Sequence, residues 1–481
     1  MDKYIPTIGL EIHAELKTRT KMFCDCKNDS GEERPNVNIC PVCLGHPGAL
    51  PVINREAVWS VLKVGAALGG HFAITTEFDR KNYFYPDIPK GYQISQYKHP
   101  LVSGGGLSGV KITRVHLEED TGTSIHSSSF AKATADKEGE YSLVNFNRAG
   151  VPLMELVTEP VIHSATVAVK FAKELQLLLQ YLEVAEANME KGEMRVEANI
   201  SLAPRSPDGV GGKLGTKVEI KNLNSFKATE KAIIYETKRQ SDLLEKGENV
   251  VQETRGWNEE RGETFSQRQK EESHDYRYFP EPDLPRIDIT KVFEFNRENI
   301  LAALPATPQN KRENLSSEFG IKESDIEFYV NNILFMNFAE QIFRSGDSAF
   351  NQLASNYIVS DLASRGEDYR KISPANFTQL IEMISAGKIS SRGAKDILEI
   401  MPDSPKPPEV IAQEKNLMQK SNMSELEEIV NEVMTQNQSI VLEYRNGKIS
   451  ALQFLVGQAM KKSAGSANPQ MLKEILEKRM S

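Results

Sequence analysis

The sequence contains few cysteines, and they are confined to one short segment. Only four occur in 481 residues, and all of them fall between positions 24 and 43. No cysteine outside this segment is available as a separate nucleophile. Two close pairs separated by a loop are typical of a zinc ribbon or knuckle, because each pair can close onto one tetrahedral ion. We therefore expect a closed structural Zn²⁺ site, with unrelated buried thiols as the alternative, at Cys24, Cys26, Cys40 and Cys43.

The sequence also lacks a long apolar run and a signal peptide. No run approaches the roughly 20 apolar residues that cross a bilayer, and the N-terminus lacks the regions that mark a secreted chain. We therefore expect a cytoplasmic protein with no membrane partner. The formal net charge of −9 argues against a protein that coats nucleic acid non-specifically. A local basic contact with RNA and a carboxylate-rich metal site are both compatible with this charge.

Several catalytic motifs are missing as well. The stretch GGGLSGVK comes closest to a phosphate-binding P-loop, but Val110 stands where that motif requires lysine. No H-E-x-x-H or G-x-S-x-G motif occurs. If the chain binds ATP, we expect it to do so on the face of a sheet.

Residues 1–293 show a mixture of strand and helix patterns. Apolar and polar residues alternate in GLEIHAEL, VKITRVHLEED, MRVEANISL and TKVEIKNLNSF, as in strands with one buried face. Helical patterns intervene, one of them beginning after Ser164, a suitable N-cap. This combination predicts an α+β body in which helices back one side of an antiparallel sheet. A polar insertion at 131–139 is expected to be a hairpin tip without chemistry.

The pattern becomes helical after about residue 293. The run PDSPKPPEV at 402–410 predicts a proline-rich linker. The last sixteen residues predict a helix with an apolar stripe at Leu472, Ile475 and Leu476. We therefore expect three parts: a catalytic body at 1–293, an all-α connector at 294–405 and a small helical tail at 406–481.

Acidic residues occupy polar positions of several predicted strands. GLEIHAEL carries Glu11 and His13, RVEANISL carries Glu197, KVEIKNL carries Glu219, and HLEED adds Glu119. A Mg²⁺–ATP site needs hard oxygen ligands for the metal and cations for the phosphates. The same pattern also describes the solvated face of an antiparallel sheet, so the pattern alone leaves both interpretations open. The cations on the same strands are Arg195, Lys217 and Lys221.

Six stretches are long enough to carry a family resemblance. They are IGLEIHAEL, FDRKNYFYPDIPKGYQISQ, HLEEDTGTSIH, NRAGVPLMELVTEP, EIKNLNSF and DYRYFPEPDLP. Together they closely resemble the GatB/GatE family of aminoacyl-tRNA amidotransferase subunits, and its B-type members in particular. The resemblance runs almost from end to end, and the tail is similar to the YqeY-like domain that closes these subunits.

The resemblance implies an ATP-dependent carbon–nitrogen ligase of translation. Such a subunit uses ATP and Mg²⁺ to phosphorylate the side-chain carboxylate of Glu-tRNA(Gln) or Asp-tRNA(Asn), and ammonia then displaces the phosphate. The ammonia comes from glutamine hydrolysis in an A subunit, and a small C subunit completes a heterotrimer. The implied fold is a glutamine-synthetase-like cradle, with the tail binding tRNA. Which of the two charged tRNAs is the substrate stays open.

The resemblance also assigns residues to the site. It implies Mg²⁺ ligands at Glu11, His13 and Glu119. Strict alternation places Glu119 beside Leu117, so either a bulge turns Glu119 inward or the acids lie on a turn, and either Glu118 or Glu119 faces the metal. The further residues implied are Glu155, Glu197 and Glu219 at the site or the mouth of an ammonia channel, and Arg80, Lys81 and Arg148 near phosphate or the tRNA end.

Two other functions compete with this interpretation. A freestanding ligase for a small carboxylic acid would consume ATP with free glutamate and ammonia, without tRNA. A non-catalytic RNA-binding protein would depend on its zinc knuckle and helical tail, and would tolerate the loss of Glu11 or Glu219.

Overall fold

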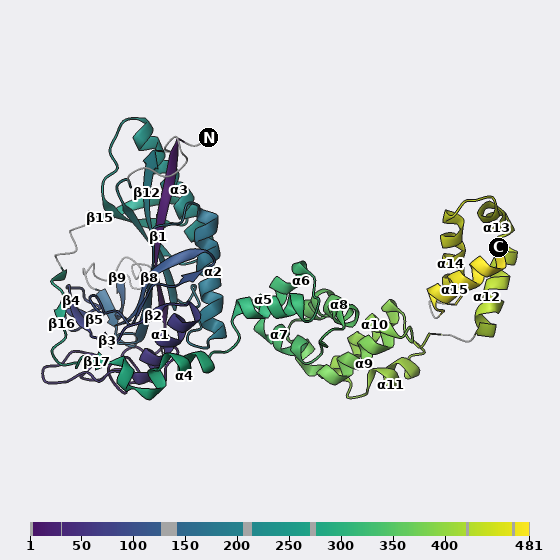
Figure 1. Cartoon of the computed structure of the whole chain (residues 1–481), viewed down its shortest axis with the longest axis horizontal. Helices are drawn as coiled ribbons and strands as arrows, with labels where there is room; N and C mark the ends of the chain where they lie inside the picture. The colour runs from purple at the N-terminus through teal and green to yellow at the C-terminus, as the bar shows by residue number, and fades with distance from the viewer. Residues whose placement is uncertain are drawn as a thin grey trace, which may run out of the picture. The chain divides into compact units, whose positions relative to one another are not determined.

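The computed structural model describes residues 3–29, 31–126, 142–204, 214–269, 276–419, 423–463 and 467–480. The chain divides into two compact units, Met1–Thr307 and Pro308–Ser481. Figure 1 shows that the first is rich in strands and that the second consists of helices. This is the α+β body followed by helices that the sequence predicts. Across the described ranges, no helix is both long and apolar enough to cross a membrane.

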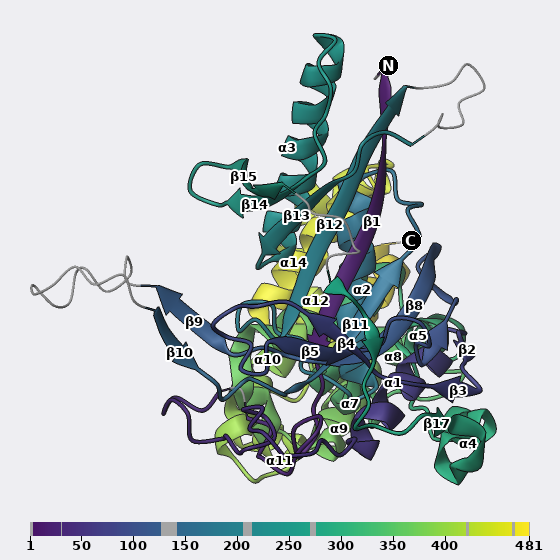
Figure 2. The same ribbon diagram turned by 90° about the vertical axis from the view of Figure 1, so that its left-hand side faces the viewer.

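A large sheet forms the first unit, and its central strands are those that the alternation predicts. The strand order is β15-β14-β13-β12-β1-β11-β8-β6-β2, with β7 paired to β8. Strand β1 pairs antiparallel with both β12 and β11, and Figure 2 shows β1 and β12 side by side. The strands are β1 (Tyr4–Glu15), β2 (His71–Phe72), β6 (Val102–Ser103), β7 (Gly106–Leu107), β8 (Val110–Glu119), β11 (Pro152–Thr158), β12 (Met194–Pro204), β13 (Val218–Leu223), β14 (Glu253–Asn258) and β15 (Glu263–Gln269).

One pair departs from the expected antiparallel arrangement. Strands β13 and β14 are parallel. Helix α3 (Phe226–Glu245) lies between them in the chain, and a parallel pair needs a long connection of this kind. The sheet is therefore antiparallel through its centre and mixed at this edge.

The two faces of the sheet differ, as an alternation of period two requires. On β1, Ile8, Leu10 and Ile12 are fully buried in the core of this unit. Helix α2 (Ala165–Tyr181) packs against β1 and α3 packs against β12, and the two helices contact each other. The Ser164 hydroxyl accepts a hydrogen bond of 3.3 Å from the Val167 N–H, which confirms the predicted N-cap of α2. The alternate side chains of β1 therefore lie on the opposite, polar face.

Smaller elements complete the described part of the first unit. Strands β4 (Asp79–Asn82), β5 (Tyr92–Ser95) and β16 (Phe279–Pro280) form one small sheet, and β5 contacts β8. The insertion at 131–139 lies outside the described residues. The other elements are β3 (Thr75–Thr76) paired with β17 (Ile287–Asp288), β9 (Thr123–His126) paired with β10 (Ser142–Asn145), and helices α1 (Arg55–Ala67) and α4 (Arg297–Ala302).

The second unit is helical, and its last four helices share an apolar core. Leu472, Ile475 and Leu476 are buried in that core with Leu426 and Leu455, which confirms the predicted stripe. The three-part division at residues 293 and 405 stays a prediction. The helices are α5 (Pro308–Ser317), α6 (Glu323–Asn331), α7 (Ile333–Glu340), α8 (Ser348–Tyr357), α9 (Pro374–Ser385), α10 (Ser391–Ile400), α11 (Pro408–Glu414), α12 (Met423–Gln436), α13 (Gln438–Arg445), α14 (Ser450–Lys462) and α15 (Pro469–Met480).

Candidate functional site

Three carboxylates from three adjacent strands meet on the polar face of the sheet. Glu11 of β1 lies opposite Glu197 of β12, and Glu219 of β13 lies opposite Asn199 of β12. Residues opposite each other in an antiparallel pair point to the same face. One carboxylate oxygen from each glutamate lies within 4.8 Å of the others. We call Glu11, Glu197 and Glu219 the carboxylate cluster, and its geometry suits a shared cation.

The surroundings of the carboxylate cluster leave it rich in negative charge. Burial, and then the neighbouring carboxylates Glu155, Glu197 and Glu219, raise the pKa of Glu11. The Asn199 amide donates a hydrogen bond of 2.8 Å to Glu11. The Lys221 amine lies 2.9 Å from Glu197. Burial alone would lower the pKa of Lys221, but Glu197 and Glu219 raise it, so Lys221 supplies a positive charge beside the cluster.

A second group on the same face combines imidazole and carboxylate. His13 Nε2 lies 3.6 Å from Glu118 Oε1 and 3.5 Å from Glu155 Oε2. His116 Nε2 lies 3.3 Å from the same Glu155 oxygen. Burial alone would lower the pKa of His13, but Glu155 and Glu118 raise it to about 9. Burial likewise opposes ionisation of Glu155, yet His116 and His13 lower its pKa well below the usual range.

The structure does not bring Glu119 beside Glu11 and His13. The Glu119 carboxylate instead pairs with Lys90 and accepts a hydrogen bond of 2.9 Å from the Ile94 N–H. The register of β8 against β11 is regular from Leu117 to Glu119, and its shift lies farther along, at Val157 and Thr158 of β11. With no bulge to reverse it, the alternation continues, so Glu118 shares the face of His13 and Glu119 points to the other side.

Besides Lys221, two more of the predicted cations lie close to these clusters. Arg195 is opposite His13 in the sheet and pairs with the buried Asp120. The Lys81 amine lies 5.7 Å from the Tyr83 ring centroid and 5.3 Å from that of Tyr276. Although burial alone would lower it, the pKa of Lys81 is raised, first by the Glu118 carboxylate. Lys81 is therefore a partly buried cation at the edge of the imidazole and carboxylate group.

The remaining predicted cations have other positions. Arg80 forms an ion pair of 2.6 Å with Glu281, because successive residues of β4 point to opposite sides. Lys217 is exposed just before β13. Arg148 lies 3.7 Å from Asp120 and donates to the carbonyls of Thr121 and Gly122. Burial alone would raise the pKa of Asp120, but Arg195 and Arg148 lower it.

Sequence reasoning did not assign several residues that the fold brings to this face. The sequence leaves open whether Glu118 or Glu119 faces the metal. His116 lies two positions before Glu118 on β8, so the alternation of the strand places both on the same face. Asp120 follows directly after β8, where local periodicity no longer reports a direction. Its ion pair with Arg195 joins segments that are distant in sequence, so local periodicity does not predict it.

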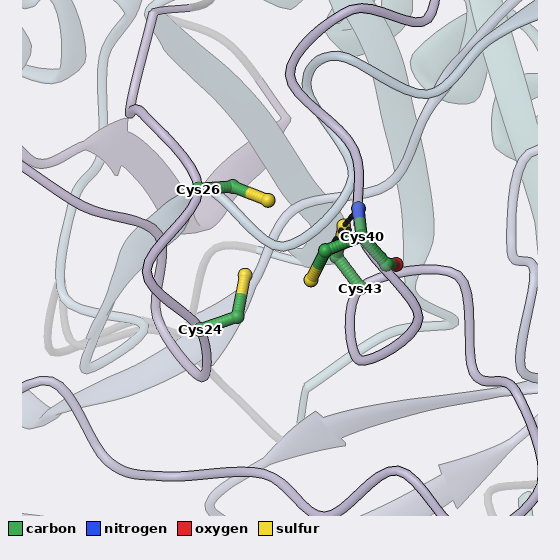
Figure 3. A group of neighbouring side chains, drawn as sticks. All are labelled: Cys24, Cys26, Cys40 and Cys43. Carbon is green, nitrogen blue, oxygen red and sulfur yellow. Dashed lines mark hydrogen bonds between the residues drawn. The ribbon is translucent and has the colours of Figure 1, made fainter.

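The four cysteines come together from two turns of the chain, as Figure 3 shows. All four are free, and their sulfur atoms lie within 4.8 Å of one another. The Cys40 and Cys43 sulfurs are 3.9 Å apart, close to the roughly 3.8 Å between ligands of a tetrahedral Zn²⁺ with Zn–S bonds of about 2.3 Å. A hydrogen bond with Cys24 lowers the pKa of Cys43 to about 5 against the effect of burial, with a smaller contribution from Lys21. The set fits a single metal ion.

Comparisons with known proteins cover nearly the whole chain. A family model described as "GatB/GatE catalytic domain" matches residues 6–294, and one described as "GatB domain" matches residues 337–480. The B subunit of the aspartyl/glutamyl-tRNA(Asn/Gln) amidotransferase from Thermoanaerobacter pseudethanolicus is 42% identical over 494 aligned residues, covering 100% of both chains. The protein of the same name from Carboxydothermus hydrogenoformans is 41% identical with the same coverage. That of Thermomicrobium roseum is 43% identical over 98% of this chain and 97% of its own.

Proposed function

Because this chain belongs to the GatB/GatE family, we propose that it is the B subunit of a tRNA-dependent amidotransferase. In this function, ATP phosphorylates the side-chain carboxylate of Glu-tRNA(Gln), of Asp-tRNA(Asn), or of both. Ammonia attacks the resulting acyl phosphate, the bond from carbon to the phosphate oxygen breaks, and the product is Gln-tRNA(Gln) or Asn-tRNA(Asn). Activation is needed because a carboxylate is a poor acceptor for ammonia, whereas phosphate is a good leaving group.

The carboxylate cluster is the observation that carries this proposal. Glu11, Glu197 and Glu219 present oxygen atoms within 4.8 Å of one another on a face that also carries the cation Lys221. Lys81, from the neighbouring small sheet, adds positive charge near Glu118 of the same face. Phosphoryl transfer depends mainly on positioning and on neutralising the charge of the phosphates. An oxygen-rich metal site bordered by lysine and arginine meets both requirements.

Magnesium fits the carboxylate cluster better than it fits the imidazole group. Mg²⁺ prefers oxygen ligands, and the raised pKa of Glu11 reflects its burial and the neighbouring carboxylates. In the imidazole group, Glu118 and Glu155 already contact His13, and Glu155 also contacts His116. We therefore assign Mg²⁺ to Glu11, Glu197 and Glu219. When bound there, Mg²⁺ would neutralise and orient phosphate oxygens.

The chain's own cations then have distinct roles in the proposal. Lys221 holds Glu197 in place and offers positive charge to a phosphate. Lys81 carries its charge beside Glu118, under two tyrosine rings. Arg195, anchored by Asp120, lies across from His13 and orients the acceptor carboxylate. Each can stabilise charge that develops during transfer of the phosphoryl group.

The proposal includes partners and a role for each remaining part of the chain. Ammonia would come from an A subunit that hydrolyses glutamine, and a C subunit would complete the heterotrimer. The helical tail at 406–481 would bind tRNA, with 294–405 as its connector. A Zn²⁺ ion at the four cysteines would hold the loop at 24–43 in its fold. Its role would be structural and not catalytic, because four thiolates leave no open position for a water or a substrate.

Reconstitution with A and C subunits tests the proposal. Mischarged Glu-tRNA(Gln) or Asp-tRNA(Asn) should trigger ATP cleavage, and glutamine or ammonia should then complete the amide. Cleavage of ATP with free glutamate and no tRNA would indicate a freestanding ligase instead. Full activity of the Glu219→Gln variant would show that the carboxylate cluster is not the site.

A further inference from the structure

Lys21 is an unusual residue next to the cysteines. Its side chain is fully buried, and its amine donates hydrogen bonds of 2.7 Å to the carbonyls of Asn38 and Ala149. It also lies 3.4 Å from the carbonyl oxygen of Phe146 and 3.9 Å from the Cys43 sulfur. Among the described residues, no ion pair joins Lys21 to a carboxylate. A buried ammonium without a counter-charge is costly, so a nearby anion would stabilise it.

The cysteine cluster supplies that anion when it binds metal. Thiolates, not thiols, ligate Zn²⁺, and four of them around one Zn²⁺ leave a net charge of about −2. We propose that Lys21 is the counter-charge of the metal centre formed by the four cysteines, and that through its carbonyl contacts it couples metal binding to the position of the loop at 146–150. This inference rests on the zinc site of the proposed function and assigns it a buried partner.

The loop at 146–150 connects Lys21 to the candidate site. Beyond the bonds from Lys21, the Met22 N–H donates to the Gly150 carbonyl at 2.7 Å, and the Gly150 N–H donates to the Asp120 carbonyl at 2.8 Å. The same loop carries Arg148, which faces the Asp120 carboxylate. That carboxylate pairs with Arg195 on β12.

A small cavity lies beside the same loop, and residues of the cysteine turn, of the loop and of the candidate site all line it. Its lining includes Cys43, Lys90, Glu119, Asp120, Ala149 and Gly150. Lys21 is thus a positioning residue, acting on the site through the loop and not by contact with substrate.

The test compares Lys21→Met with Lys63→Met in the full-length chain. Lys63 is a matched control, because it is also buried and donates to a backbone carbonyl, that of Leu182, at 2.6 Å, and among the described residues no hydrogen bond joins it to a cysteine. Zinc affinity is measured by competition with a chromophoric chelator at constant pH. Lys21→Met should weaken zinc binding by roughly 10- to 100-fold, the usual effect of removing an outer-shell partner. Lys63→Met should bind zinc as the wild type does.

Amide hydrogen exchange measures the coupling to the loop at 146–150, which metal affinity alone does not report. Removing zinc from the wild type should speed exchange at 146–151, and Lys21→Met should show the faster exchange even with zinc bound. If Lys21→Met does not yield folded chain, Lys21→Gln keeps a donor for the carbonyls but lacks the charge, and the same comparison applies.

The outcomes separate the two proposals. A wild-type chain that binds no stoichiometric zinc would overturn the zinc site itself. Stoichiometric zinc in the wild type, with unchanged affinity and unchanged exchange at 146–151 in the Lys21 variant, would overturn the role of Lys21 and leave the zinc site standing.

Discussion

Glu11 of β1 lies directly opposite Glu197 of β12, so two carboxylates face each other across adjacent antiparallel strands. Like charges in directly opposed positions destabilise a sheet, and the raised pKa of Glu11 reflects both its burial and this repulsion. Without a metal the pair therefore opposes folding. With a divalent cation between them, the same carboxylates become ligands.

The first prediction concerns Glu11→Gln. The substitution keeps an acceptor for the Asn199 amide and removes the charge, so the metal-free chain should be as stable as the wild type or more stable by up to roughly 1 kcal/mol. Activity in the reconstituted complex should fall by roughly a hundredfold or more, because a metal ligand contributes several kcal/mol to transition-state stabilisation. Urea unfolding and tRNA-dependent ATP cleavage measure the two effects. Glu263→Gln, a partly exposed glutamate of β15, is the control and should change neither.

The second prediction concerns the pH dependence of the metal-free chain. The pKa of His13 is raised from 6.5 to about 9, so His13 contributes stability that is fully present below pH 6.5 and is lost as pH rises through about 9. The difference in unfolding free energy between the wild type and His13→Gln should therefore shrink over this window, by up to about 3 kcal/mol. A difference independent of pH between 6 and 10 would show that His13 is not held as a cation by Glu118 and Glu155.

The third prediction distinguishes Glu118 from Glu119. Glu119→Gln leaves Lys90, whose side chain is only 9% exposed, without its partner, which should cost about 3–5 kcal/mol of unfolding free energy. Replacing both residues, as Lys90→Met with Glu119→Leu, should restore much of that loss. Glu118→Gln should instead reduce activity while costing less stability. Equal loss of activity per folded chain in the two single variants would contradict the placement of Glu118, and not Glu119, on the face of His13.

The fourth prediction concerns the cysteines. Cys24→Ser should abolish stoichiometric zinc and lower the unfolding temperature of the first unit by a few degrees, since about 1 kcal/mol corresponds to roughly 2–4 °C in a domain of about 150–250 residues. The folded fraction should lose much less ATP-cleaving activity than Glu11→Gln does, because zinc acts on the site only through the fold and the loop at 146–150. A non-catalytic RNA-binding protein would show the reverse order, with Cys24→Ser abolishing function and Glu11→Gln leaving it intact.

Local periodicity is sufficient to predict the central strands of the sheet and which of their residues lie on the polar face. The alternation in GLEIHAEL placed Glu11 and His13 on one side of β1, and Ser164 marked the start of α2, because both signals depend on neighbours in sequence. Periodicity could not give the pairing of distant strands. That His13 lies between Arg195 and Glu155 depends on the register of β1 against β12 and β11.

Glu119 shows how small a local change alters a predicted site. A shift of one residue turns a side chain to the other face, and HLEED contains acids at consecutive positions, so the sequence does not say which of them faces the metal. The parallel pair β13 and β14 was missed for a related reason. The alternation of apolar and polar residues is the same in parallel and antiparallel strands. The parallel direction depends on the long connection through α3, which follows β13 and precedes β14 in the chain.

Binding of Mn²⁺ to the full-length chain, followed by electron paramagnetic resonance and by competition with Mg²⁺, tests the central claim most directly. The account predicts one Mn²⁺ site, from which Mg²⁺ displaces the Mn²⁺. This site should be lost in Glu219→Gln and kept in Glu263→Gln. Undiminished Mn²⁺ binding by the Glu219→Gln variant would contradict the assignment of the metal to Glu11, Glu197 and Glu219.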